Sequence, residues 1–259
     1  MAAHPFSIAK WYLDCVTESG ETAILYCATI HWRGIKMATG SLLTSHESHT
    51  ETHSSLGAYH LSDECSEIRV EHPALHASGR WLADSSPVQR IVYEGPRGCV
   101  TWNCLQPRSR VSLRTRDREI TGLGYAECLT LTLPPWHLPL RKLRWGRFVA
   151  EYDSLAWVDW QGEHSTCFAI LNGHEFQPSA VTETEVLLPQ AALQIEDSQT
   201  LRAGKLGATI LPQLPALRRL FPRSLFNIQE QKWRSRGTLR TPGGESRGWV
   251  VHEVVDWAL

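Results

Sequence analysis

The chain has 259 residues, with 26 Lys and Arg against 27 Asp and Glu, and a formal net charge of −1. A chain of this length can bury a large core, either as one domain or as two. The near-neutral charge offers no excess of cations to a phosphate backbone or an anionic membrane surface, so we do not expect nucleic acid as a partner.

Most segments alternate between apolar and polar residues with period two and end at turn residues, a pattern typical of antiparallel strands. The predicted strands lie at 10–17, 22–32, 37–44, 65–71, 88–94, 98–105, 108–116, 119–133, 143–151, 154–160, 166–172, 180–188, 228–240 and 247–257. Turn signals such as ESGET, YEGPRG and LNGHE separate neighbours by a few residues, as hairpins require. Fourteen strands exceed what one twisted sheet holds comfortably, so we predict two curled sheets or barrels.

Three segments depart from this pattern. Residues 44–60 are rich in Ser, Thr and His, and predict a long surface loop. Prolines at 134, 135 and 139 cannot continue a central strand, and they predict a boundary between a lobe at 1–135 and a lobe at 136–259. Residues 211–222 carry leucines three apart between prolines, which predicts one short helix near 213–221.

A faint internal echo also favours two similar halves. IHWRGIKM at 30–37 resembles LRWGRFVA at 143–150. Two short similarities of this kind are weak evidence of a repeat.

The seven cysteines predict a reducing environment. No CxxC occurs, and most of the cysteines have apolar, strand-like neighbours, so they resemble buried thiols. A Cys99–Cys104 pair is the less favoured alternative. The first residues lack a basic and apolar leader, and no stretch approaches the roughly 18 apolar residues that span a bilayer, so we expect a soluble, cytoplasmic protein. The sequence is compatible with a homodimer.

Four predicted strands carry an ionisable group on their more apolar face. Glu127 alternates with Tyr125 and three leucines, and Arg147 alternates with Trp145. Asp159 shares parity with Trp157, and Glu253 shares parity with Trp249 and Trp257. Burying a charge without a partner costs several kcal/mol. The inside of a barrel that encloses a ligand cavity would explain the pattern, whereas an ordinary Arg147–Glu127 salt bridge, or wrongly assigned faces, would explain it without function.

Several segments together suggest a family. KWYLDCVTESGETAILYCATIHW, GLGYAECLTLTLPPWHLPLRKLRWGRF and GWVVHEVVDWAL resemble, in order and style, the two-lobed lipocalin-like superfamily of carotenoid 1,2-hydratases, AttH-type proteins and lipocalin-like Diels-Alderases. The matching positions in the G-x-G-Y-x-E and W-G-R motifs are Gly122, Gly124, Tyr125, Glu127, Trp145, Gly146 and Arg147. At 259 residues the chain is shorter than typical hydratases.

The resemblance implies an all-β fold of two antiparallel β-barrel lobes packed together, with a mainly apolar ligand site inside one lobe or between them. It also implies activity without metal or nucleotide on terpenoid or polyketide-like molecules. The sequence agrees with the absence of nucleotide chemistry, since it has no GxSxG elbow, no GxxxxGK[ST] loop and no dinucleotide fingerprint. His46, His49 and His53 invite a metal site, but a flexible loop would not preorganise them, so we expect no metal.

The leading hypothesis is therefore a cofactor-independent lyase or isomerase that hydrates, cyclises or isomerises an apolar terpenoid- or polyene-like molecule. Glu127, with Asp159 or Glu253, would move a proton, while Arg147 and Tyr125 would tune its pKa and hold a polar group. The candidate substrate-binding residues are Tyr125, Trp102, Asn103, Trp145, Trp157, Asn172, Trp249 and Trp257. Asn103, Asn172 and Tyr125 have the alternative role of capping turns.

Two other classes of function stay open. A non-catalytic lipocalin-like carrier of an apolar metabolite would use the same pocket but would tolerate amides in place of its carboxylates. A protein-interaction module would pack its 11 tryptophans into a solid core.

Overall fold

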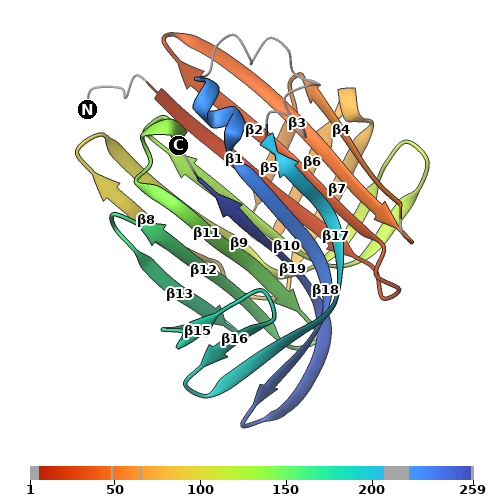
Figure 1. Ribbon diagram of the computed structural model, residues 1–259. Helices are drawn as coiled ribbons and strands as arrows, with labels where there is room; N and C mark the ends of the chain where they lie inside the picture. The colour runs from red at the N-terminus through yellow and green to blue at the C-terminus, as the bar shows by residue number, and fades with distance from the viewer. Residues whose placement is uncertain (1–5, 48, 65, 207–221, 258–259) are drawn as a thin grey trace. The chain divides into compact units, whose positions relative to one another are not determined.

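The computed structural model describes residues 6–47, 49–64, 66–206 and 222–257 of the chain. Contacts divide it into two units, the first ending at Leu138 and the second beginning at Pro139 (Figure 1). Each unit is one curled antiparallel sheet, so the prediction of an all-β fold with two half-barrel sheets is confirmed. The helix predicted near 213–221 lies outside the described residues.

The first unit holds ten strands, arranged in the order β4-β3-β2-β1-β10-β9-β7-β6-β5, with β8 also paired to β9. Its first strand pairs with its last, β1 with β10, from Ile8 to Val16. The strands are β1 (Phe6–Val16), β2 (Thr22–Trp32), β3 (Ile35–His46), β4 (His49–Leu56), β5 (His60–Glu64), β6 (Glu67–His72), β7 (Ala77–Ala83), β8 (Val88–Gly95), β9 (Gly98–Arg114) and β10 (Glu119–Leu131), with 3₁₀ turns η1 (Pro73–Leu75) and η2 (Pro135–His137).

The second unit holds nine strands, arranged in the order β14-β13-β12-β11-β19-β18-β17-β16-β15. Again the first strand pairs with the last, here β11 with β19. The elements are β11 (Leu140–Val149), β12 (Ser154–Gly162), β13 (Thr166–Leu171), β14 (His174–Phe176), β15 (Ala180–Val181), β16 (Glu185–Leu188), β17 (Ala191–Lys205), η4 (Arg223–Asn227), β18 (Gln229–Thr241) and β19 (Gly244–Asp256).

The similarity of the halves lies in this topology and not in the sequence echo. Residues 30–37 form the β2–β3 hairpin, whereas residues 143–150 belong to the opening strand of the second unit. By strand order the counterpart of β11 is β1, so the two echoing segments are not equivalent.

The prediction of a long surface loop at residues 44–60 is wrong. Residues 49–56 form β4, which pairs with β3 in register. His49, Glu51 and His53 alternate with Thr50 and Thr52, a period-two pattern that the polar composition concealed.

Other strand predictions also need correction. Residues 98–114 form one strand and not two, while 180–188 contains two short strands. The polar strands β5, β7, β14 and β17 were not predicted.

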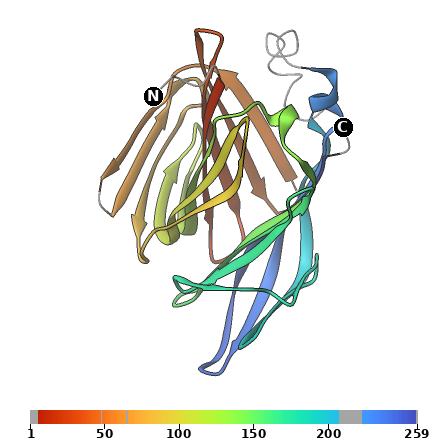
Figure 2. The same ribbon diagram turned by 90° about the vertical axis from the view of Figure 1, so that its left-hand side faces the viewer.

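The apolar core of each unit lies on one face of its sheet. In the first unit this face includes Leu13, Leu25, Trp81, Leu113 and Ala126. In the second unit it includes Phe148, Trp157, Leu193, Leu239 and Val250. Figure 2 shows the twist and curl that let each sheet wrap around such a cluster.

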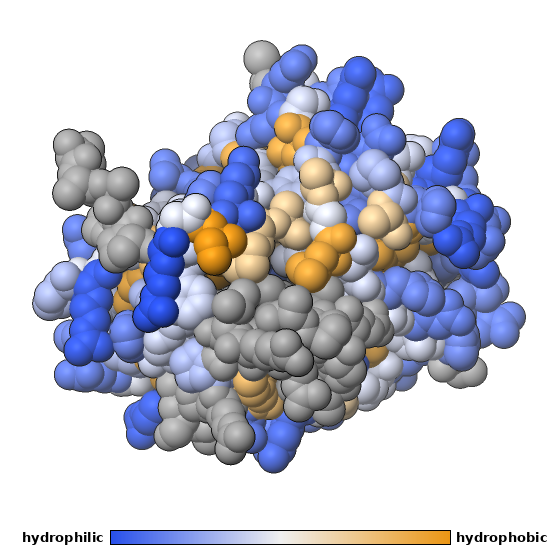
Figure 3. Space-filling model, turned by 90° about the horizontal axis from the view of Figure 1, so that it is seen from above, coloured by the Kyte–Doolittle hydropathy of each residue, from blue (hydrophilic) through white to orange (hydrophobic). Residues whose placement is uncertain are grey.

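Exposed hydrophobic residues are few and scattered. Ile35, Leu56, Leu82, Ile91 and Tyr152 are the exposed large ones among the described residues, and four of them sit on four different strands. In the view of Figure 3, hydrophilic residues cover most of the outer part of the face. No described helix is long and apolar enough to cross a membrane.

Candidate functional site

A backbone irregularity in the first unit positions Tyr125. The β9–β10 ladder pairs Gly124 with Ser109 and Ala126 with Gln106, so Tyr125 faces two residues of β9, one of which is Pro107. Proline has no N–H to donate at such a point. The backbone N–H of Tyr125 donates instead to Oδ1 of Asp14, at 3.0 Å.

Glu127 lies two residues further along β10, on the same face as Tyr125. Its Oε2 accepts a hydrogen bond from the Tyr125 hydroxyl at 2.6 Å and another from Trp102 Nε1 at 2.5 Å. All three residues are buried, Glu127 being 9% exposed. Two buried donors therefore fix the orientation of this carboxylate.

The buried Tyr125 hydroxyl keeps its proton at neutral pH. Burial, followed by the nearby Cys104 and Glu127, raises the pKa of Tyr125 well above its usual value. Burial likewise raises the pKa of Cys104 far above normal. Tyr125 is thus a fixed donor, and Cys104 is an inert thiol.

A second carboxylate completes the arrangement. Asp14 is fully buried on β1, and its Oδ2 accepts a hydrogen bond from the Tyr12 hydroxyl at 2.8 Å. Tyr12 faces Glu127 across the β1–β10 ladder, and Asp14 faces Tyr125. We call Tyr12, Asp14, Tyr125 and Glu127, with Trp102, the carboxylate cluster.

The carboxylate cluster lies on the face opposite the apolar core of its unit. Along β10 the core face carries Gly124, Ala126 and Cys128, which pair with Cys15, Leu13 and Trp11. Glu127 therefore does not project into the core of its own sheet.

The second unit contains a chain of ion pairs. Arg202 on β17 binds Oε1 of Glu230 through Nη2 at 2.6 Å, and Lys232 Nζ lies 4.0 Å from the same oxygen. Lys232 also pairs with Glu253 and lies over the Trp145 ring, 5.4 Å from its centroid. Opposite charges on three adjacent strands thus neutralise one another.

The four ionisable residues predicted as catalytic do not share one face. Arg147 and Glu253 lie on the face of the second sheet that is opposite its apolar core. Asp159 lies on the core face, where Oδ2 accepts hydrogen bonds from Arg144 at 3.3 Å and from Gln161 at 2.7 Å. Asp159 therefore does not share a sheet face with Arg147 and Glu253.

The other predicted binding residues have varied surroundings. Trp157 packs in the second core, against Gly146. Asn172 occupies a tight turn at φ +49°, where its side chain binds Ser154 N and Asp153. Asn103 Nδ2 donates to the carbonyl of Cys128 at 3.3 Å.

Trp249 and Trp257 lie on and just after β19. The Trp249 ring contacts Arg234 and Arg236. The backbone N–H of Trp257 donates to the carbonyl of Arg141. Among the twelve predicted residues, side-chain hydrogen bonds join Tyr125 and Trp102 to Glu127, and Arg147 to the backbone carbonyl of Trp249.

Two cavities lie elsewhere in the first unit. One, of about 660 Å³, is lined by residues of β5, β6, β7, β9 and β10, including Leu61, Arg69 and Arg80. The other, of about 400 Å³, is lined by His46, His49, His53 and Glu51. His49 and His53 bind Glu51 and lower its pKa.

Within the described residues no group of His, Cys, Asp and Glu has a metal-binding arrangement. The six cysteines in the described part of the chain are thiols and not members of disulfides.

Sequence reasoning missed Tyr12 and Asp14 as site residues. Their spacing, Tyr-x-Asp in KWYLDC, repeats the Tyr-x-Glu spacing of Tyr125 and Glu127. Two such strands paired in antiparallel order bring both carboxylates to one face, so the signal was present. Arg202 gave no comparable signal because its strand, β17, was not predicted. Glu230 and Lys232 lie on a predicted strand, but their neighbours there are mostly polar and do not single them out.

Comparison with solved structures places the fold. An AttH-like protein from Nitrosomonas europaea matches with a TM-score of 0.55 and 10% identity, over 98% of this chain and 93% of that one. Kievitone hydratase from Nectria haematococca matches with a TM-score of 0.58 and 11% identity, over 97% and 90%. CghA, a Diels-Alderase, matches with a TM-score of 0.62 and 9% identity, over 97% and 88%.

The two-lobed lipocalin-like fold expected from the sequence is therefore confirmed. At these identities the likeness concerns the fold alone. No protein-family model and no curated protein matches the chain.

Proposed function

We propose that the protein is a cofactor-independent enzyme of the lyase or isomerase class, which moves a proton on an apolar, unsaturated small molecule. The observation that carries the proposal is the double hydrogen bond from Tyr125 and Trp102 to one oxygen of Glu127. Fixed donors hold a carboxylate in one geometry, as general acid–base catalysis requires.

Proton transfer falls to Glu127 in this proposal. Asp159 is held by Arg144 and Gln161, and Glu253 is paired with Lys232. In an isomerisation the Glu127 carboxylate removes a proton from carbon, becomes a carboxylic acid, and returns the proton to another carbon. This step needs no external oxidant or reductant. Two proteins of similar fold are a hydratase and a Diels-Alderase, which supports the class but not the reaction or the substrate.

Solvent deuterium provides a test. The wild-type protein is incubated in D2O with ligand that co-purifies with it and, separately, with a panel of terpenoids and polyenes. The masses of the recovered molecules are then measured by mass spectrometry. We expect deuterium on carbon with the wild type and none with Glu127→Gln, although that variant still binds the ligand. Glu119→Gln, an exposed change on the same strand, serves as the matched control and exchanges like the wild type.

The carrier hypothesis predicts a different result. If the wild-type protein returns every ligand unchanged and without deuterium, while Glu127→Gln binds equally well, the protein is a carrier and the proposed chemistry is wrong.

A further inference from the structure

The face of β18 that lies opposite the apolar core carries a run of cations. Lys232, Arg234 and Arg236 alternate along the strand and therefore share this face. Lys232 is matched by Glu230 and Glu253. The two arginines are arranged differently.

Both guanidinium groups lie over one indole ring. The Arg236 guanidinium carbon is 3.6 Å from the Trp249 ring centroid, and that of Arg234 is 4.7 Å away. Stacking on an aromatic face is a normal use of arginine and leaves its N–H groups free to donate. Two positive charges are thereby held close to the same indole ring.

Arg236 has a nearby carboxylate that it does not use. Glu196 on β17 is directly opposite Arg236 in the ladder, yet no ion pair joins them. Among the described residues Arg236 makes no hydrogen bond or ion pair, and its side chain is exposed. The guanidinium is available to an external anion.

The surroundings hold Arg234 and Trp249 in place. Nη2 of Arg234 donates to Oε1 of Gln199 on β17. Nη1 of Arg147, which is 1% exposed, donates to the carbonyl oxygen of Trp249 at 2.9 Å. Burial, and after it the charge of Arg236, lowers the pKa of Arg234, so the two guanidinium groups repel each other. An anion bound between them relieves this repulsion.

We propose that Arg234 and Arg236 form a binding site for the carboxylate of a small organic anion, with Trp249 as its apolar wall and Arg147 as a positioning residue. Guanidinium groups present a planar fork of donors that fits a carboxylate. The half-buried indole ring of Trp249 offers contact to an apolar body. The site goes beyond the proposed function, because it belongs to the second unit and does not require proton transfer at Glu127.

A matched pair of probes tests the site on the full chain. 1-Naphthoate carries the carboxylate, and 1-naphthamide has the same ring system without the charge. By equilibrium dialysis we expect 1-naphthoate to bind about tenfold more tightly than the amide, with an affinity that falls as salt is raised. Arg236→Gln should weaken 1-naphthoate by about tenfold and leave the amide unchanged.

Two further variants separate binding from folding. Glu196→Gln removes the negative charge directly opposite Arg236 in the β17–β18 ladder. This variant should bind 1-naphthoate more tightly than the wild type, a gain in affinity that unfolding cannot produce. Arg247→Gln removes an exposed arginine of β19 that pairs with Glu245, and should change nothing.

The outcomes are decisive in each direction. Equal affinity for the two probes, or an Arg236→Gln variant that folds and binds 1-naphthoate like the wild type, overturns the site. Glu127→Gln should bind 1-naphthoate normally, so failure of the anion site and failure of the proposed reaction give different results.

Discussion

In the first unit, the buried carboxylates Asp14 and Glu127 accept hydrogen bonds from tyrosine, tryptophan and a backbone N–H. In the second unit, Glu230 and Glu253 pair instead with Arg202 and Lys232. The two pairs occupy similar places in the two sheets. In each pair one carboxylate lies on the last strand of the sheet, β10 or β19, and the other lies on a strand paired with it, β1 or β18.

The difference shows how one topology can give buried carboxylates different roles. The tyrosine and tryptophan donors orient Glu127 without bringing a charge of their own. A lysine or arginine partner neutralises the carboxylate and makes both members necessary to each other. The proposed function uses the first arrangement for chemistry, and we expect the second to contribute stability.

Breaking the second arrangement should have the largest effect. Glu230→Gln removes the anion between Arg202 and Lys232, which are 9% and 1% exposed. Removing one member of a buried ion pair costs about 3–5 kcal/mol. We expect this loss in the free energy of unfolding by urea. Glu245→Gln, which breaks the exposed pairs with Arg240 and Arg247, is the control and should cost at most about 1 kcal/mol. Equal losses for the two variants would show that the buried chain is not structural.

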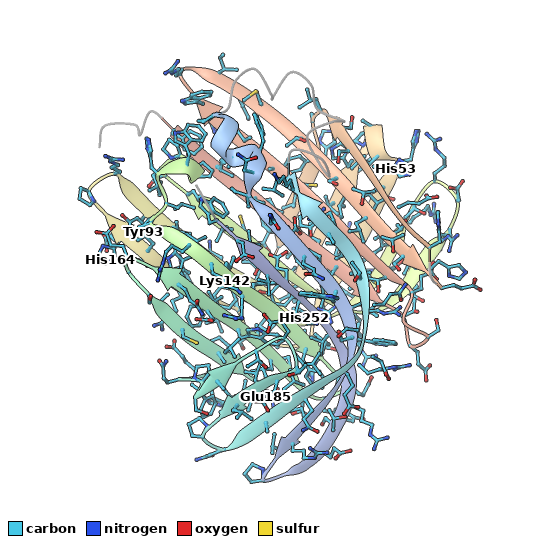
Figure 4. The ribbon with its side chains drawn as sticks, in the orientation of Figure 1. His53, Tyr93, Lys142, His164, Glu185 and His252 are labelled. Atoms are coloured by element: carbon cyan, nitrogen blue, oxygen red, sulfur yellow. The ribbon has the colours of Figure 1, made fainter. Side chains whose placement is uncertain are left out.

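Acid should destabilise each unit through a buried histidine. His252 on β19 (Figure 4) bonds Ser235 Oγ through Nε2 at 2.9 Å, and burial, followed by Lys232, lowers its pKa from 6.5 to about 4. His72 of the first unit is fully buried, and within the described chain neither of its ring nitrogens has a hydrogen bond. Burial lowers its pKa too.

For both histidines the folded protein binds the proton less readily than the unfolded chain. Their contribution to stability is therefore complete above pH 6.5 and is lost as the pH falls toward the folded pKa, which for His252 is about 4. For His252 the full loss is roughly 3 kcal/mol. Urea unfolding at pH 7 and pH 4.5 should show a smaller acid loss in His252→Asn and in His72→Phe than in the wild type. Only the His252 variant should also lose stability at pH 7, because it gives up the bond to Ser235. An unchanged acid loss in both variants would place the sensitivity elsewhere.

Much of the fold was predictable because burial on one face imposes a period of two. The strand at 22–32 was predicted with its observed bounds. The pattern fails where strands are polar or irregular. In β17 the run Glu196–Gln199 interrupts the ladder, with Asp197 at φ +52°, so its alternation is broken. In β9, Pro107 led to the prediction of two separate strands. It lies where the ladder to β10 is interrupted, so its missing N–H leaves no hydrogen bond unmade and the strand continues.

The candidate site was only partly predictable, for a related reason. Parity along β10 identified Glu127 and Tyr125 as neighbours on one face, and the structure joins them by a hydrogen bond. Parity does not say which face of a sheet carries the core when both faces are buried. The donor Trp102 and the partner Asp14 come from β9 and β1, so their contacts depend on the register between strands. For Asp14 the two strands, β1 and β10, are also far apart in the sequence.

The smallest change in stability should come from the residue to which we assign the chemistry. In Glu127→Gln the amide oxygen can accept the hydrogen bonds of Tyr125 and Trp102, so these two donors keep an acceptor of similar shape. We expect a loss of at most about 1 kcal/mol in the free energy of unfolding, the usual net value of one hydrogen bond. Tyr125→Phe should cost somewhat more, since it deletes a fully buried hydroxyl. If Glu127→Gln instead destabilised the protein as much as Glu230→Gln, Glu127 would be serving as a structural charge, and the contrast between the two units would disappear.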